Sequence, residues 1–516
     1  MSTLIKSTVS VGSMTLLSRV LGLARDIVIA RFFSASDAAD AFFVAFKIPN
    51  FLRRLFAEGA FSLAFVPVLS EYRSQFSMAQ TRDLIDRVAG TLGFILLLLS
   101  LLGVVASPLL IAVFAAGFID QPAKFDLTAD MLRLTFPYIL LISMTAMAGG
   151  ILNTWKHFAV PAFTPVLLNL SLIGCALWLS PRLEVPITGL AWGVLLAGIL
   201  QLLFQLPFLY REGLLPRPKW GWRHEGVQKI IKLMIPALFG SSVAQINLLF
   251  DTFIASFLVS GSVSWLYYAD RLLEFPLGVF GIALATVVLP NLSQAHYRAG
   301  DDSFNNTLQW AIQLALVIAV PAAIGLFILA QPILATLFQY GRFSDSDSLM
   351  SALSLMAYSL GLPAFILIKI LANGFYARQD TKTPVRIGIE AMFINMALNV
   401  VFVLSMLQTD FIAPHVGLAL ATSASAYYNA FRLARGLRRD AILAPAASFG
   451  TPLLKILCGC VVMSMLIYFM LPELAGWAEL RWYDRLLELL RLILPAILCY
   501  AAMLWIMGFR RQHFIA

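Results

Sequence analysis

SRVLGLARD (residues 18–26) and DAFFVAFKIPNFLRR (residues 40–54) are the two stretches around which the chain is organised. Both belong to long hydrophobic segments that are typical of membrane-spanning helices. Five basic side chains lie in these stretches: Arg19, Arg25, Lys47, Arg53 and Arg54. Because a charge at membrane depth costs about 3 kcal/mol or more, these side chains predict a polar cavity that receives an anion.

The composition indicates a polytopic membrane protein. The 516 residues are 60% hydrophobic and 13% charged, whereas soluble domains have about 25% charged residues. We attribute the net charge of +9 to cytoplasmic loops rather than to nucleic-acid binding. The four cysteines lie in apolar runs without CxxC spacing, which predicts buried thiols: Cys175, Cys458, Cys460 and Cys499.

Hydropathy predicts an all-α fold with fourteen transmembrane helices, at roughly 20 apolar residues each. The predicted spans are 8–33, 40–70, 88–115, 129–152, 162–180, 187–209, 229–259, 264–293, 307–338, 348–372, 385–406, 416–432, 451–472 and 488–508. Pro49, Asn50 and Gly59 predict a broken second helix, and residues 71–87 a charged loop. Basic residues concentrate in loops after even-numbered spans, which places both termini in the cytoplasm.

Two short motifs recur at an offset of about 220 residues, which is typical of repeated transporter lobes. AFVPVLS (64–70) resembles TVVLPNLS (286–293), and residues 153–165 resemble residues 373–384. An even number of spans per repeat predicts two parallel six-helix lobes, although chance similarity stays open as an alternative. The expected domains are an N-terminal lobe (1–226), a C-terminal lobe (227–440) and a C-terminal helix pair (441–516).

Enzyme signatures are missing from the sequence. It contains no GxxxxGK[ST] phosphate loop, no HExxH and no GxSxG. The five histidines are scattered, so we expect no transition-metal site. We therefore predict a transporter, not an enzyme, that works without a cofactor on an ion gradient, the membrane potential or the substrate gradient.

The basic residues of the first two spans suit a diphosphate, because guanidinium forks bind phosphate oxygens bidentately. Arg19 and Arg25 are six residues apart, so they share a cavity only if the helix bends, for example at Gly22. The alternative for both is an ion pair with Asp26 or Asp40. The alternative for Arg53, as for its neighbours Lys47 and Arg54, is a side chain that extends to the membrane surface.

The predicted second lobe adds further polar groups. Arg271 and Glu274 lie in one helix, where the arginine can complete the basic set and the glutamate can pair with it or gate the cavity. A structural ion pair near the membrane surface is the alternative. A possible cation site combines one carboxylate with neutral oxygens: Asp251, Asn395, Asn399 and Thr422. An Asp251 that is protonated or hydrogen-bonded within the bundle is the alternative there.

Several blocks of the sequence together resemble one family. They are SRVLGLARD (18–26), residues 40–72, FPYILLISMTAMAGGILNTW (136–155), SGSVSWLYYADRLLEFPLGVFGIALAT (260–286), LFQYGRF (337–343) and GFYARQDTKTPV (374–385). They resemble the MurJ (MviN) family of bacterial lipid II flippases, part of the multidrug/oligosaccharidyl-lipid/polysaccharide exporter superfamily. The likeness covers nearly the whole chain and weakens after about residue 405.

The resemblance implies two six-helix lobes around a V-shaped cavity, with a C-terminal helix pair that forms a groove for a lipid tail. It implies that lipid II, an undecaprenyl-diphosphate-linked peptidoglycan precursor, moves from the cytoplasmic to the periplasmic leaflet. The family's cavity arginines match Arg19, Arg25, Arg53 and Arg271, and its acidic or gating residues match Asp40 and Glu274, beside which we place Asp26. Coupling to Na⁺ or H⁺ is implied as well.

Three other interpretations stay open: a flippase of another undecaprenyl-linked glycan, a cation-coupled multidrug exporter and a membrane scaffold. Spans thirteen and fourteen could equally be two packing helices. We expect an inner-membrane protein, monomeric, with lipid II and membrane lipids as its partners and no nucleic acid. Contacts with the cell-wall synthesis or division machinery are left open.

Overall fold

The computed structural model describes residues 2–54, 60–298, 300–439, 442–443, 450–472 and 474–509. These residues are mostly helical and contain no β-strand, which confirms the all-α prediction. Contacts divide the chain into two compact units, residues 1–264 and 265–516. The division falls within the first turn of helix α11 (Ser262–Pro276). The lobe limits at 226/227 and 440/441 stay predictions.

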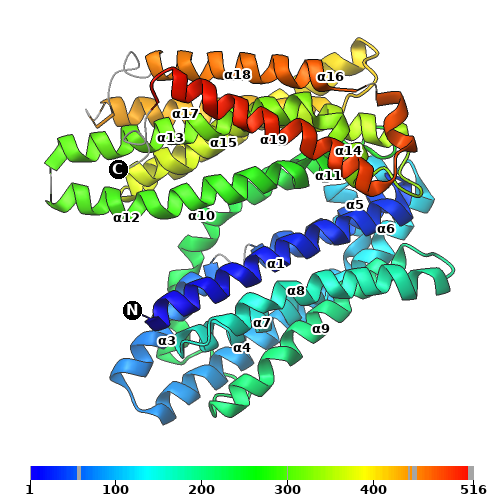
Figure 1. Cartoon of the computed structure of the whole chain (residues 1–516). Helices are drawn as coiled ribbons and strands as arrows, with labels where there is room; N and C mark the ends of the chain where they lie inside the picture. Colours follow the sequence, from blue (N-terminus) through cyan, green and yellow to red (C-terminus); the bar gives the residue numbers. More distant parts are fainter. Residues whose placement is uncertain are drawn as a thin grey trace. The chain divides into compact units, whose positions relative to one another are not determined.

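The described part of the first unit consists of helices α1 to α10, joined by loops and short helical turns (Figure 1). The long helices are α1 (Ser2–Phe33), α2 (Asp37–Arg53), α3 (Ser62–Gln75), α4 (Met78–Val105), α5 (Ser107–Phe114), α6 (Pro122–Thr135), α7 (Tyr138–Thr154), α8 (Ala159–Gly174), α9 (Thr188–Arg211) and α10 (Glu225–Ala255). The short turns are η2 (Ala116–Phe118), η3 (Cys175–Leu179) and η4 (Ser180–Arg182).

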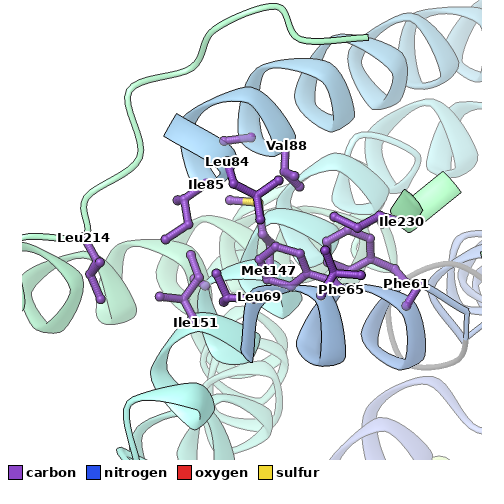
Figure 2. Packing of buried hydrophobic residues seen from close by; sticks show 14 of the residues in the cluster. Phe61, Phe65, Leu69, Leu84, Ile85, Val88, Met147, Ile151, Leu214 and Ile230 are labelled. Atoms are coloured by element: carbon purple, nitrogen blue, oxygen red, sulfur yellow. The ribbon is translucent and has the colours of Figure 1, made fainter. Parts of the chain in front are cut away.

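A buried cluster holds α3, α4, α7 and α10 of this unit together (Figure 2). Phe65 of α3, Leu84 of α4 and Ile151 of α7 are fully buried in it. Leu214, from the loop between α9 and α10, joins the same cluster and fixes that loop to the helices. Ile230 brings in α10, so α10 packs within the first unit.

Serine caps decide where two of these helices begin. The Ser36 hydroxyl accepts a hydrogen bond from the Ala39 amide at 3.3 Å and starts α2. The first turn of α2 consequently contains Asp37 and Asp40, where the helix dipole favours carboxylates. Ser77 starts α4 in the same way, with Gln80 completing a capping box.

The second unit contains the remaining helices. They are α11 and its π-helical continuation η5 (Leu277–Gly281), α12 (Ile282–Arg298), α13 (Gly300–Ile328), α14 (Ala330–Leu337), α15 (Asp345–Tyr376), α16 (Lys382–Gln408), α17 (Val416–Arg439), α18 (Gly450–Met470), η7 (Leu474–Glu479) and α19 (Trp482–Ile506). Helix α15 packs between α13 and α17, and α18 and α19 pack on each other. The Tyr500 hydroxyl of α19 donates to the Val317 carbonyl oxygen of α13 at 2.8 Å, which ties the C-terminal pair to this unit.

Among the described residues, nine helical segments are long and apolar enough to cross a membrane. They are Met78–Val105, Pro122–Thr154, Ala159–Arg182, Thr188–Arg211, Ser303–Ile328, Asp345–Tyr376, Lys382–Gln408, Gly450–Met470 and Trp482–Ile506. The other predicted spans coincide with helices α1, α2–α3, α10, α11–α12 and α17. Of these helices, α1 carries Arg19 and Arg25, α2 carries Arg53 and α11 carries Arg271, and these charges lower the hydropathy of the three helices.

Two local expectations differ from the structure. The charged segment 71–87, expected as a loop, is helical except around residues 76–77, because Ser77 lets α4 start directly after α3. Pro49 does not break α2, which continues through it to Arg53. The expected break at Gly59 lies outside the described residues.

Candidate functional site

Arg25 is buried on α1, where two side chains fix its guanidinium group. Its Nε and Nη2 atoms donate to Asp26 Oδ1 at 2.9 and 2.7 Å, and Nη1 donates to Asn169 Oδ1 of α8 at 3.1 Å. The Asn169 amide in turn donates to the Ser18 carbonyl oxygen at 2.9 Å. The alternative interpretation of Arg25, an ion pair with Asp26, is therefore the arrangement in this structure.

Arg19 lies on the same helix but in different surroundings. It is only partly buried, and its neighbours Leu16 and Val20 are exposed. Among the described residues it has no hydrogen-bond or ion-pair partner. Helix α1 is continuous past Gly22, which lies beside Asn169 rather than at a helix break. The Arg19 guanidinium thus has no partner among the described residues, whereas Arg25 is bound to Asp26 and Asn169.

The basic residues of α2 are bound to polar groups. The Arg53 Nε donates to Asn50 Oδ1, one turn earlier, at 2.8 Å. The Lys47 ammonium donates to the Thr252 hydroxyl of α10 at 3.1 Å, so it reaches a neighbouring helix. Arg54 follows in a π-helical residue and is partly buried. One contact of Arg53 is therefore a neutral amide of its own helix.

Asp40 is a buried carboxylate of the first unit that accepts four hydrogen bonds. It is 1% exposed, and Oδ1 accepts from the Ser264 amide at 2.9 Å and from the Ser264 hydroxyl at 2.6 Å. Oδ2 accepts from the Gly261 amide at 2.8 Å and from the Lys124 ammonium of α6 at 3.2 Å. One buried carboxylate therefore joins α2, α6 and the α10–α11 turn.

Asp37 extends these contacts to the surface. Its Oδ1 atom accepts from Lys124 at 2.7 Å and from the Ser260 hydroxyl at 2.6 Å. Partial burial alone would raise the pKa of Asp37, but the hydrogen bonds from Lys124 and Ser260 outweigh it and lower that pKa from 3.8. We call this set the Asp40 network: Asp37, Asp40, Lys124, Ser260, Gly261 and Ser264.

A second contact holds the α10–α11 turn from the other side. The Gly117 amide of η2 donates to the Ser256 hydroxyl at 3.0 Å. A Cβ atom at Gly117 would lie 2.3 Å from the Ser256 carbonyl oxygen, so only glycine allows this approach. No sequence pattern had pointed to Gly117, Ser256 or Lys124. The available signal was that Lys124 is one of few basic residues in loops after odd-numbered spans.

Arg271 and Glu274 form an ion pair on α11 in the second unit. Arg271 Nη1 and Glu274 Oε2 are 2.7 Å apart, and the two side chains are 26% and 44% exposed. The guanidinium carbon also lies 4.9 Å from the centre of the Tyr267 ring. The predicted ion pair between Arg271 and Glu274 is present, and both side chains are partly exposed.

Three of the four candidate cation ligands lie together in the second unit. The Asn395 amide donates to the Thr422 and Ser425 hydroxyls, each at 3.3 Å, and the Asn399 amide donates to Asn395 Oδ1 at 3.0 Å. Both asparagines are buried. Asp251 lies on α10 in the first unit and is partly buried. The Ser425 hydroxyl adds an oxygen that was not among the four predicted ligands.

An apolar groove of about 780 Å³ lies between the C-terminal helix pair and α13. Pro321 and Leu326 of α13, Ile467 of α18, and Ile497 and Leu504 of α19 contribute to its walls. Its lining is almost entirely hydrocarbon, which matches the chemistry of an alkyl or polyprenyl chain.

Comparisons with known proteins agree with this architecture. The sequence profile of the lipid II flippase MurJ family matches residues 29–480. A probable lipid II flippase MurJ of Vibrio cholerae is 50% identical over 98% of this chain and 97% of its own length. The lipid II flippase MurJ of Burkholderia cenocepacia is 41% identical over 99% of both chains.

Solved structures show the same fold. A lipid II flippase MurJ in an inward closed conformation superposes with a TM-score of 0.80 at 29% identity, covering 96% of this chain and 98% of that one. An inward-facing multidrug transporter of the MATE family reaches a TM-score of 0.67 at 15% identity, covering 84% and 98% of the two chains, and shows the fold alone. These relatives are named as transporters, not as enzymes. The chain is a multi-pass membrane protein that belongs to the MurJ family of lipid II flippases.

Proposed function

We propose that this protein carries lipid II from the cytoplasmic to the periplasmic leaflet of the bacterial inner membrane by alternating access. Besides family membership, the observation that supports this most is the Asp40 network. In this network a buried, multiply bonded carboxylate lies at a junction of helix ends, and we assign the gate of the transport cycle to this junction.

The gate would lie on the periplasmic side, with both termini in the cytoplasm. The α1–α2 and α10–α11 turns follow odd-numbered spans, where basic residues are few. Opening that side requires Asp40 to release Gly261 and Ser264. Each hydrogen bond to a charged group contributes about 1.5–3 kcal/mol, so the closed arrangement persists until another interaction replaces it.

The diphosphate of lipid II would bind to Arg19, Arg25, Arg53 and Arg271. Arg19 has no hydrogen-bond or ion-pair partner among the described residues, so it can take up phosphate oxygens without losing a carboxylate. Arg25 must first exchange Asp26 for the substrate. This predicts that Arg19 captures the headgroup first and that Arg25 follows as α1 and α8 rearrange.

The polyprenyl tail would use the groove beside α13. Exposing a long hydrocarbon to a polar cavity costs about 0.8 kcal/mol for each CH₂ group. The groove and the adjoining lipid avoid this cost while the headgroup crosses. The C-terminal helix pair thereby has a role beyond packing.

A monovalent cation would couple to this cycle at Asn395, Asn399 and Thr422, with Asp251 as the charged ligand. Turning the Asn395 and Asn399 amides together by 180° keeps one hydrogen bond between them and directs the Asn395 oxygen toward the Thr422 and Ser425 hydroxyls. This gives three neutral oxygen ligands from Asn395, Thr422 and Ser425. Hard cations such as Na⁺ prefer this chemistry. H⁺ bound to Asp251 is the second candidate.

Depletion of the protein in its host tests the function. We expect lipid II to accumulate in the cytoplasmic leaflet and the cells to lyse, and normal lipid II export would overturn the proposal. Accumulation of a different undecaprenyl-linked glycan, or altered drug export alone, would favour the two other transporter interpretations.

Arg19→Ala should abolish complementation of the depleted strain while the protein still accumulates in the membrane. Arg31→Ala is the matched control, because Arg31 is an exposed arginine near the end of the same helix. Loss of the Arg19→Ala protein from the membrane would mean that Arg19 is structural instead.

A further inference from the structure

The loop between α9 and α10 (residues 212–224, the α9–α10 loop) lies in extended form along the first half of α4. The Arg217 amide donates to Asp86 Oδ1 at 2.7 Å, the Lys219 amide to the Asp86 carbonyl oxygen at 3.0 Å, and the Gly221 amide to the Thr91 hydroxyl at 3.1 Å. These three bonds, together with the buried Leu214, hold the loop in one place.

The loop and the helix touch backbone to backbone. A Cβ atom at Gly90 of α4 would lie 2.2 Å from the Lys219 carbonyl oxygen. A Cβ atom at Gly221 would meet the Arg87 side chain at 2.4 Å. Glycine on each side therefore permits the close fit, and the loop is a fixed part of the first unit.

The α9–α10 loop exposes two tryptophans near Phe94, in the middle of α4. Trp220 and Trp222 are 57% and 41% exposed, and their rings stack at 6.4 Å between centres. Trp220 also meets Phe94 of α4 edge-on at 5.2 Å. The α4 residues before this point include Arg82 and Arg87, whereas exposed side chains from Phe94 onward are apolar: Phe94, Ile95, Leu97, Leu98, Leu101, Leu102 and Val105.

The tryptophans therefore stand at the boundary between the polar and the membrane-embedded parts of α4. Indole rings concentrate at this depth of a bilayer, because their hydrocarbon body and their N–H group favour the headgroup region. The same loop brings cationic side chains to the level of the two tryptophans. Arg217 and Arg223 are exposed, and no carboxylate among the described residues lies within ion-pair distance of either.

We infer that the α9–α10 loop is a binding site for anionic phospholipid headgroups of the cytoplasmic leaflet. Trp220 and Trp222 sit in the headgroup region, and the Arg217 and Arg223 guanidinium groups contact lipid phosphates. Lys219 is less available, since its ammonium lies 3.0 Å from Asp86 Oδ2. This inference rests on the proposed cytoplasmic position of the loop. Binding of phospholipid headgroups at the loop would fix the depth of α4 and α10 in the membrane independently of lipid II.

Quenching of tryptophan fluorescence in the full-length protein tests the site. The protein is reconstituted in vesicles that contain brominated phosphatidylglycerol or brominated phosphatidylcholine. The difference in emission between the parent and Trp220→Phe/Trp222→Phe isolates the two loop tryptophans. We expect both lipids to quench this difference signal, with a clear preference for phosphatidylglycerol at equal mole fraction.

Arg217→Gln/Arg223→Gln should remove that preference. A basic residue near an anionic surface changes affinity by roughly 5-fold, so two of them account for a preference of up to about 30-fold. Arg182→Gln/Arg342→Gln removes the same charge from exposed positions in loops after odd-numbered spans and should leave the preference intact. Matching thermal unfolding of all variants excludes misfolding as the cause.

Three results would overturn the inference. No quenching by either lipid means that the loop lies in water. Equal quenching by both lipids in the parent means that the headgroups are not selected by charge. Protection of the loop tryptophans by added lipid II, with no effect of phosphatidylglycerol, makes the loop part of the substrate path. Because the vesicles otherwise contain no lipid II, the outcome does not depend on whether the protein flips it.

Discussion

The Asp40 network of the first unit and the Arg271–Glu274 pair of the second unit both join opposite charges, but in opposite surroundings. Asp40 and Lys124 are 1% and 6% exposed, and Asp40 accepts hydrogen bonds from three residues of two other elements. The Arg271 and Glu274 side chains are 26% and 44% exposed and lie within one helical turn. A buried, long-range network has to be replaced as a whole, whereas a half-exposed local pair can exchange one partner for a substrate.

Asp40→Asn is expected to have the largest effect. The asparagine amide would place an N–H donor opposite groups that now donate hydrogen bonds to Asp40. The substitution also leaves Asp37 as the only carboxylate of the network that contacts Lys124. Breaking a buried ion pair by removing one charge costs about 3–5 kcal/mol. Thermal unfolding should therefore begin well below that of the parent.

Labelling of a cysteine at Val263 separates unfolding from opening. Val263 is 1% exposed and lies in sequence between Gly261 and Ser264 of the network. The experiment uses a parent in which the four native cysteines are replaced by alanine. If the Asp40→Asn protein is folded and its Val263→Cys thiol reacts faster than in the parent, the gate has opened. Asp37→Asn is the control, since the Asp37 side chain is 59% exposed. An Asp40→Asn protein that melts like the parent and stays unlabelled would contradict the gating role.

Gly117→Ala tests the same turn through packing instead of charge. The added methyl group would lie 2.3 Å from the Ser256 carbonyl oxygen, so backbone has to move. Overpacking of this kind costs about 1–3 kcal/mol, measurable as a lower melting temperature. Gly388→Ala is the matched control, because nothing lies within 4 Å of its Cβ position in α16, and alanine there should stabilise the helix slightly. Equal melting temperatures for both variants would mean that the η2 contact is loose.

The helices and the candidate charges were predictable from the sequence, while the partners of those charges were not. Hydropathy located nine helical segments, among the described residues, that are apolar enough to cross a membrane, because apolar runs are local. An i,i+3 spacing sufficed to pair Arg271 with Glu274. Asp40 meets Lys124 only because α2 packs on α6, and Arg25 meets Asn169 only because α1 packs on α8. Such contacts depend on tertiary packing, which one sequence does not encode in any short pattern.

Arg271→Gln should change function far more than stability. A half-exposed pair within one helical turn contributes about 0.2–1 kcal/mol, so the melting temperature should stay close to that of the parent while complementation is lost. Glu274→Gln breaks the same pair and keeps the guanidinium. If Arg271 binds the diphosphate, Glu274→Gln retains more lipid II transport in proteoliposomes than Arg271→Gln. Equal loss in both variants would instead show that the ion pair itself is what matters.

Asp37 should produce the smallest effect, and only in acid. Its carboxylate is stabilised in the folded state, where its pKa is lowered from 3.8. Stability from a lowered pKa is fully present above the unfolded-state value and is lost as the pH falls through the folded-state value. The melting temperature of the parent should therefore exceed that of Asp37→Asn at pH 6, and the difference should shrink as the pH falls below about 4. A difference that persists unchanged at pH 3 would mean that Asp37 acts through packing against Ser260, and the charge of the Asp40 network would then reside in Asp40 and Lys124 alone.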